Sequence, residues 1–205
     1  FVGHSLGGII GGTFLANEPG VKSAVLGMPG GGIAKLLDGS ASFGPRIAAG
    51  LAANGVVKGT ATYESFLGAT QTVIDSADPL NYAATIGAGR GVLLFEVIGD
   101  QVVPNNVMAD APAGTVPSPL ASTDPLAFFM GLSTVSATTT GTDLQAQLRF
   151  SAGNHGSILD PITPAGSTED PAVTALVTSV MQNAMAKFLF SDGGLVEVSN
   201  ATVLE

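Results

Sequence analysis

The chain of 205 residues has no cysteine, only two histidines, and only seven lysines and arginines against sixteen acidic residues. The absence of cysteine excludes thiol chemistry and thiolate metal sites. The net charge of −9 argues against a nucleic-acid partner, because binding to phosphates requires basic surfaces. No uninterrupted apolar run approaches the roughly 18 residues of a membrane-spanning helix, so we expect a membrane to be at most a surface that the chain contacts.

Small and apolar residues are what the chain has in excess. It contains 28 glycines and 12 prolines, and 45% of its residues are apolar. A chain of this hydrophobicity is not disordered. Its length is sufficient for one sizeable core, so we expect residues 1–205 to belong to a single domain.

The most informative stretch lies at the start of the chain, where the first eight residues read FVGHSLGG. This matches Gly-x-Ser-x-Gly between an apolar pair and an apolar-periodic segment, a context typical of a nucleophile elbow. We expect the turn to present the hydroxyl of Ser5 and to require glycine at Gly3 and Gly7, where side chains would be crowded. The amide of Leu6, which opens the next helix, would stabilise an oxyanion.

The hydrophobic pattern after the elbow alternates between helix and strand. A buried helix over 6–16 and a strand over 23–28 predict a parallel β-α-β unit, since the elbow itself follows a strand. Further strands are expected at 91–98, 148–151 and 195–199. Asp170 followed by Pro171 is a sound start for a helix with one long apolar face.

Two stretches interrupt this alternation. Residues 29–85 show helical patterns over 47–53 and 62–76 but no strand, so we expect them to form a helical cap inserted over the site. Residues 109–145 are low in charge and rich in proline, serine, threonine and glycine, which predicts a loop excursion.

A serine nucleophile needs a base, and the base needs an acid to orient it. The ring of His4 is expected to point away from the serine hydroxyl, which leaves His155, in a glycine-flanked loop after a short strand, as the candidate base. Asp100 is the candidate acid, because it directly follows the strongest strand and would share the carboxyl edge of the sheet with Ser5. The weaker candidates are Asp78, Asp110 and Asp160, and Asp78 is expected to cap or end a helix.

Three stretches together resemble the α/β-hydrolase fold: GHSLGG at the elbow, GDQVVP at 99–104 and NHG at 154–156. They are similar in particular to the large secreted lipases and phospholipases of Gram-negative bacteria, as is SADPLNYA at 76–83. The resemblance implies Ser5 as nucleophile, Asp100 as orienting acid and His155 as base, with no metal and no organic cofactor. It also implies a partial α/β-hydrolase fold, with a mainly parallel sheet, helices on both faces and the inserted cap.

The elbow stands at the start of this chain, whereas complete members of the family have several strands before it. We therefore expect the chain to be the C-terminal part of a catalytic domain, with the second oxyanion amide lying upstream. An open sheet edge would favour self-association or a partner, and hydrolysis by this chain alone would be slow.

The expected activity is hydrolysis of carboxylic esters of lipids, by a lipase or phospholipase that forms an acyl-enzyme. Its partners would be a lipid or ester substrate and, peripherally, a lipid surface, and the parent protein would be secreted or exposed at the cell surface. Two alternatives stay open. One is another serine acyl hydrolase, such as a carboxylesterase, thioesterase or peptidase, and the other is a non-catalytic module that contacts lipid.

Overall fold

A computed structural model describes residues 1–108, 112–163 and 166–205 of the chain. Its main sheet, as far as the described residues show it, has five strands in the order β1-β2-β3-β6-β4, and every pairing in it is parallel. Two short strands, β5 and β7, form a separate antiparallel pair. The strand bounds are β1 (Val2–His4), β2 (Ser23–Gly27), β3 (Gly91–Val97), β4 (Ser133–Thr134), β5 (Thr139–Thr140), β6 (Gln145–Phe150) and β7 (Leu195–Val196).

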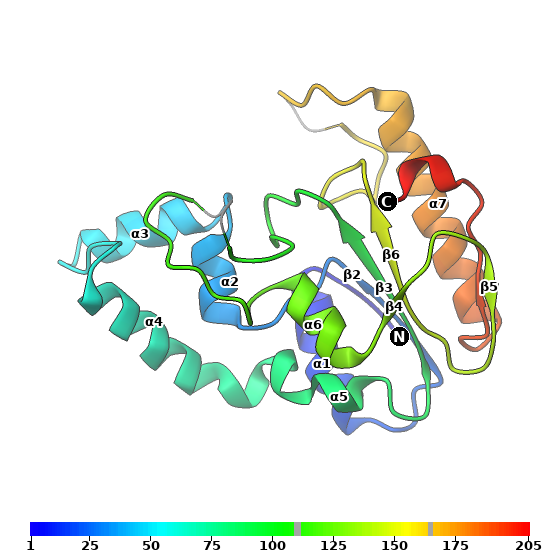
Figure 1. Ribbon diagram of the computed structural model, residues 1–205, viewed down its shortest axis with the longest axis horizontal. Helices are drawn as coiled ribbons and strands as arrows, with labels where there is room; N and C mark the ends of the chain where they lie inside the picture. Colours follow the sequence, from blue (N-terminus) through cyan, green and yellow to red (C-terminus); the bar gives the residue numbers. More distant parts are fainter. Residues whose placement is uncertain (109–111, 164–165) are drawn as a thin grey trace.

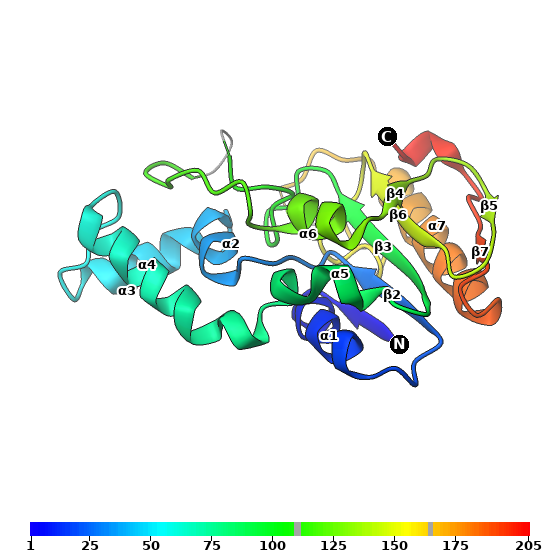
Figure 2. The same cartoon turned by 60° about the horizontal axis from the view of Figure 1, so that its bottom comes forward.

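Helices cover both faces of this sheet, which confirms the predicted α/β class (Figure 1). One face is covered by α1 (Leu6–Asn17), α5 (Ala83–Ile86) and α6 (Thr123–Met130), and the other by α7 (Pro171–Phe190). Figure 2 shows the first three helices together on one side of the strands. The short helix η3 (Ala201–Val203) ends the chain beside α7.

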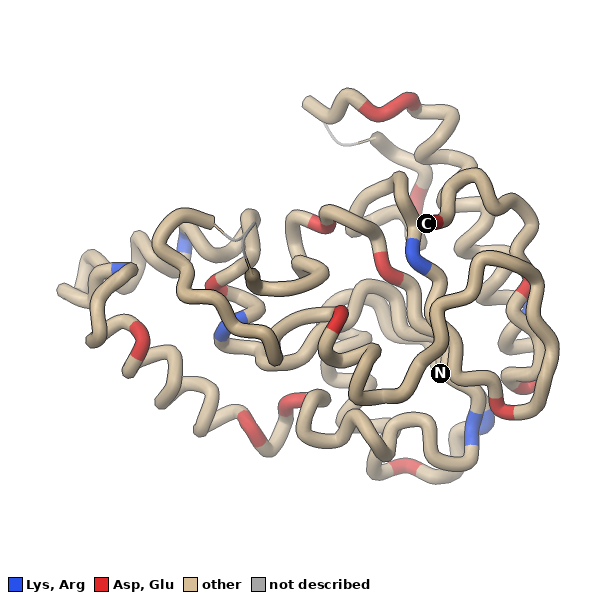
Figure 3. The backbone as a smooth tube through the Cα atoms, in the orientation of Figure 1, with Lys and Arg blue, Asp and Glu red and all other residues tan. Residues whose placement is uncertain are grey.

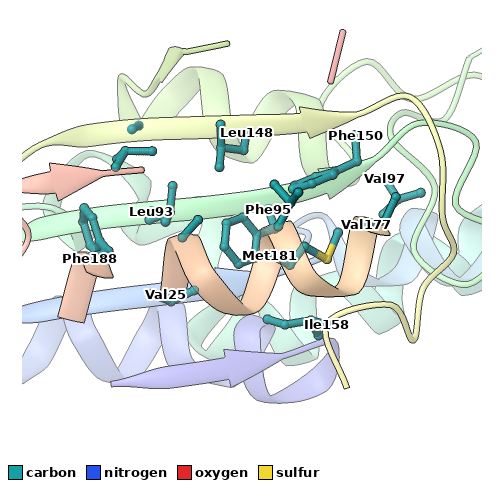
Figure 4. Packing of buried hydrophobic residues seen from close by; sticks show 14 of the residues in the cluster. Val25, Leu93, Phe95, Val97, Leu148, Phe150, Ile158, Val177, Met181 and Phe188 are labelled. Atoms are coloured by element: carbon teal, nitrogen blue, oxygen red, sulfur yellow. The ribbon is translucent and has the colours of Figure 1, made fainter. Parts of the chain in front are cut away.

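The side-chain alternation of the strands divides the core in two. In β3, Val92 and Leu94 pack with α1, α5 and α6, while Leu93 and Phe95 pack with α7. Figure 4 shows the α7 side, where Val177, Met181 and Phe188 lie against side chains of β3 and β6. Burial of the strands on both faces explains why β2 and β3 read as mainly apolar runs in the sequence, with Glu96 as the charged residue in β3.

Helix α7 is long and apolar enough, by length and composition alone, to cross a membrane. Asp170 caps it by accepting a hydrogen bond from the amide of Ala172 at 2.9 Å, as the sequence predicts. One face of α7 is buried against the sheet. In this fold it is therefore a core helix.

The loop predicted for 109–145 is interrupted, in its described part, by short helical and strand segments. Helix α6 and strands β4 and β5 form there, and β6 begins at Gln145 rather than at 148. Helix α6 has only eight residues and ends at Gly131, which adopts φ 72°. Such short elements leave too few turns for a periodic pattern to stand out. The last strand, β7, is also shorter than expected and lies outside the main sheet.

An apolar stripe on the outer side of α1 stays exposed. Leu6, Ile10 and Phe14 follow one another at helical spacing and are 64%, 59% and 45% exposed. Strand β1 beside it is an edge strand, with β2 as its partner within the described part of the chain. This is the surface through which self-association was expected, and self-association stays a prediction.

Residues 29–85 form helices and do not extend the sheet. They fold into α2 (Ile33–Gly39), α3 (Gly44–Ala52) and α4 (Ala61–Ile74), followed by η1 (Asp75–Ala77), η2 (Pro79–Tyr82) and α5. Helices α2, α3 and α4 stand away from the sheet, on the left in Figure 1, and we call them the cap. The patterns over 47–53 and 62–76 match α3 and α4, whereas the seven-residue α2 was not predicted.

Asp78 joins the cap to the rest of the fold. Its carboxylate is fully buried and accepts hydrogen bonds from the amides of Gly32 and Ile33, which open α2, at 3.0 and 2.8 Å. It also accepts from the amide of Leu80 at 3.0 Å and from the side chain of Gln71 in α4 at 2.8 Å. Asp78 therefore caps a helix, as predicted, and in addition holds α2, α4 and η2 together.

The substitution Asp78→Asn should destabilise the fold by about 2–3 kcal/mol, because an amide NH₂ would face donors that a carboxylate oxygen now satisfies. Urea unfolding followed by circular dichroism measures the loss. Asp75→Asn is the matched control, since Asp75 is exposed and also accepts from Gln71. Equal stability of the two variants would contradict the assigned role of Asp78.

Candidate active site

Ser5 lies in the sharp turn between β1 and α1. Its backbone adopts φ 55° and ψ −122°, a conformation that L-residues rarely take and that costs energy. Its amide donates to the carbonyl of Gly27 in β2 at 2.8 Å, and its carbonyl accepts from the amides of Gly8 and Ile9. Its hydroxyl makes no capping hydrogen bond to the helix that it precedes. The strained turn thus leaves the hydroxyl of Ser5 available.

The elbow needs a glycine at Gly3 but not at Gly7. A Cβ atom on Gly3 would lie 2.3 Å from the carbonyl oxygen of Gly7, which no rearrangement of a side chain can relieve. A Cβ atom on Gly7 would meet nothing within 4 Å. The expectation that both positions are crowded is therefore wrong for Gly7, because its carbonyl faces Gly3 while its own Cβ direction is open. Crowding falls instead on Gly8, whose Cβ would lie 3.1 Å from Pro29.

The amide of Leu6 occupies the first position of α1. The first amides of a helix have no partner within it, so this N–H is free to face a developing negative charge at the positive end of the helix dipole. The Leu6 side chain is exposed. No second amide that could bind the oxyanion is identified among the described residues, and the one expected to lie upstream stays a prediction.

Asp100 lies just past the carboxyl end of β3, in a turn that fixes its carboxylate. Oδ1 accepts hydrogen bonds from the amides of Val102 and Val103 at 2.8 and 3.2 Å. The side chain is almost fully buried. Two amide donors on one oxygen hold the carboxylate in a single orientation and leave Oδ2 for another partner.

That partner is His155, in the loop after β6. Its Nδ1 lies 2.6 Å from Oδ2 of Asp100. Because the carboxylate can only accept, Nδ1 carries the proton and Nε2 of the neutral ring is an acceptor. Nε2 is buried and has no hydrogen-bond partner among the described residues. The pair therefore has the tautomer that a general base needs, and its proton-accepting atom is unoccupied.

His4 contacts the same loop. Its Nε2 donates to the backbone carbonyl of His155 at 2.7 Å, and the two imidazole rings lie 4.9 Å apart at an angle of 48°. Burial lowers the pKa of His4, which keeps its ring neutral at neutral pH. No sequence pattern indicates this contact, because the two residues are far apart along the chain. It joins the elbow directly to the loop of the candidate base.

A buried polar cluster supports the turn that carries Asp100. The side chain of Asn105 accepts from the amide of Gly99 at 2.7 Å and donates to the carbonyl of Val97 at 2.8 Å, which closes the turn. It also donates to Glu96 at 2.7 Å, and Arg149 donates to the same carboxylate at 2.9 Å. Burial raises the pKa of Glu96 to about 7, with the neighbouring Asp124 adding to the rise and Arg149 opposing it. These residues were not singled out from the sequence.

The carboxylates of Asp78 and Asp160 make no hydrogen bond to the base. Asp78 is committed to the junction of the cap, and Asp160 accepts from the amide of Ile162 at 2.9 Å on the surface. Asp110 lies outside the described residues. In the described part of the chain, no group of three or more histidine, aspartate or glutamate side chains has the arrangement that holds a metal ion.

Apolar side chains connect the elbow, the cap and the acid turn. Ile9 of α1, Leu36 of α2 and Val103 are buried against one another. A cavity of about 590 Å³ lies between the cap and the acid turn, with Asp100, Pro45 and Arg149 in its wall. Neither Ser5 nor His155 lines this cavity. It therefore borders the site from the side of Asp100 only.

Comparisons of the chain with models of protein families, with curated proteins and with solved structures find no match. The assignment of a function therefore depends on the arrangement of Ser5, Asp100 and His155 themselves.

The elbow geometry predicts opposite outcomes for two alanine substitutions that the sequence motif treats alike. Gly3→Ala should destabilise the turn by about 2 kcal/mol or more, because the added carbon overlaps the carbonyl of Gly7. Gly7→Ala should be neutral or slightly stabilising, since its Cβ enters open space within a helix. Thermal unfolding of both variants measures the difference. Equal losses at the two positions would contradict the elbow described here.

Proposed function

We propose that this chain carries the nucleophile, base and acid of a serine ester hydrolase that acts on lipid-like substrates. The observation that supports the proposal most is the hydrogen bond between Asp100 and His155, which leaves a bare Nε2 in a loop anchored to the residue before Ser5. A buried acceptor without a partner is costly, and such groups are characteristic of reactive sites. The strained backbone of Ser5 is a second, independent observation of the same kind.

In the proposed reaction, Oγ of Ser5 attacks the ester carbonyl as its proton passes to Nε2 of His155. The negative charge on the carbonyl oxygen is stabilised by the amide of Leu6, and Asp100 stabilises the imidazolium through Nδ1. Collapse of the tetrahedral intermediate breaks the bond to the alcohol, which takes the proton from Nε2. Water then attacks the acyl-serine by the same route and releases the acid and Ser5.

The reaction requires a hydrogen bond between Oγ of Ser5 and Nε2 of His155, whereas Nε2 has no partner among the described residues here. Contacts of this kind often form only in the complex with substrate. The missing hydrogen bond between Ser5 and His155 also favours the second candidate function, a lipid-contacting module in which the triad never assembles.

A preference for acyl chains is supported by the surroundings of the site. Ile9 of the elbow helix, Leu36 of the cap and Val103 of the acid turn pack together, and all three are apolar. Charged residues are sparse along the whole backbone and form no continuous basic stretch (Figure 3). The ion pairs of the cap, such as Lys58 with Asp38 at 2.8 Å, lie within the cap itself.

A fluorophosphonate probe tests the nucleophile. The chain should be labelled at Ser5, and Ser5→Ala should abolish the label, whereas Ser76→Ala, at an exposed serine, should label like the parent. Asp100→Asn should slow ester turnover by about 10⁴-fold, the loss typical when the acid of such a triad becomes an amide.

Mass spectrometry locates the label, and turnover of short- and long-chain esters, thioesters and peptides separates the acyl hydrolases from one another. A folded chain that takes no label at any probe concentration and hydrolyses none of the esters would support the non-catalytic module instead.

A further inference from the structure

The loop that carries His155 is anchored to the elbow through the side chain of His4. His4, the residue before the nucleophile, donates from Nε2 to the carbonyl of His155 at 2.7 Å. Asp100 fixes the ring of His155 from its Nδ1 side. The backbone of the base is thus fixed by the elbow and its ring by the acid turn.

The ring of His4 is itself well placed by packing. It lies over Gly27 of β2, where a Cβ atom would come 3.6 Å from Cδ2 of His4 and 3.3 Å from Ile158. Strand pairing sets His4 opposite Gly27 in the register of β1 and β2. Its position therefore follows from the sheet, which does not move with the loop.

The remainder of the loop is held both by its own residues and by α7, where Thr178 and Gln182 donate to the carbonyls of Asp160 and Ile158, each at 3.1 Å. The amide of Gly156 donates to the side chain of Asn154 at 2.8 Å, and the amide of Ser157 donates to the carbonyl of Asn154 at 3.0 Å. These bonds shape the turn and bind it to α7. The bond from His4 binds it directly to the elbow, because His4 and Ser5 are consecutive residues.

We propose that His4 is a positioning residue whose Nε2–H sets the distance between the base His155 and the nucleophile Ser5. The inference rests on the proposed function. His4 does not act as the base itself, since its Nε2 is engaged as a donor. A displacement of about 1 Å between reacting groups can cost on the order of 100-fold in rate. Loss of the hydrogen bond from His4 can therefore lower the rate by more than the strength of that bond alone would suggest.

Two substitutions separate the donor from the ring. His4→Phe keeps an aromatic ring over Gly27 but removes the donor, and His4→Gln places an amide N–H close to the position of Nε2. For a short-chain ester, His4→Phe should lower kcat about 10- to 100-fold with KM changed less than about twofold, because ground-state binding is untouched. His4→Gln should recover most of kcat.

Hydrogen exchange provides a readout that needs no catalysis. The amides of Gly156 and Ser157 should exchange faster in His4→Phe than in the parent chain, and at the parent rate in His4→Gln, with unfolding stability measured alongside. If the chain hydrolyses nothing but this exchange pattern appears, the proposed function fails and the anchoring of the loop stands.

Two results would overturn the inference. One is parent-like kcat and parent-like exchange in His4→Phe. The other is equal impairment of both variants in proportion to their lost stability, which would show that His4 only fills space.

Discussion

The parallel register of the central strands is the constraint on which the site depends. His4 pairs with Gly27, Gly27 with Phe95, and Phe95 with Leu148, so that β1, β2, β3 and β6 end at one edge of the sheet. Ser5, Asp100 and His155 each follow one of these strands. Strand pairing therefore places all three residues at the carboxyl edge of one sheet, where open α/β sheets form their sites.

Hydrogen bonds from backbone and amide groups then make the loops specific. Asp100 is oriented by two amides and by the turn that Asn105 closes, while the loop of His155 is bound to the elbow by His4. Among the buried side-chain atoms of the described residues, Nε2 of His155 is one of the few that have no hydrogen-bond partner. A site in which the acid–base pair is fully oriented while the proton-accepting atom stays free is suited to general base catalysis.

The sequence predicted those parts of the fold and site that depend on local patterns. Spacing and residue type predict the elbow motif, the apolar runs of β2 and β3, and Asp170 as the residue that caps the start of α7. The position of Asp100 directly after the strongest strand predicts it as the acid. Helix α6 was missed because it is short and lies in a segment of loop-like composition. The motif predicts crowding at both Gly3 and Gly7, but only the folded backbone shows that the space beside Gly7 is open. His4, Asn105 and Glu96 were missed because their contacts join residues that no local pattern relates.

The most direct test of the central claim is a crystal structure of the chain after reaction with a phosphonate ester. The account predicts phosphorus bonded to Oγ of Ser5, its oxygen facing the amide of Leu6, and Nε2 of His155 within hydrogen-bond distance of a remaining oxygen, with Nδ1 still bound to Asp100. Phosphorus on another side chain, or a modified Ser5 with His155 turned away from it, would contradict the proposed triad.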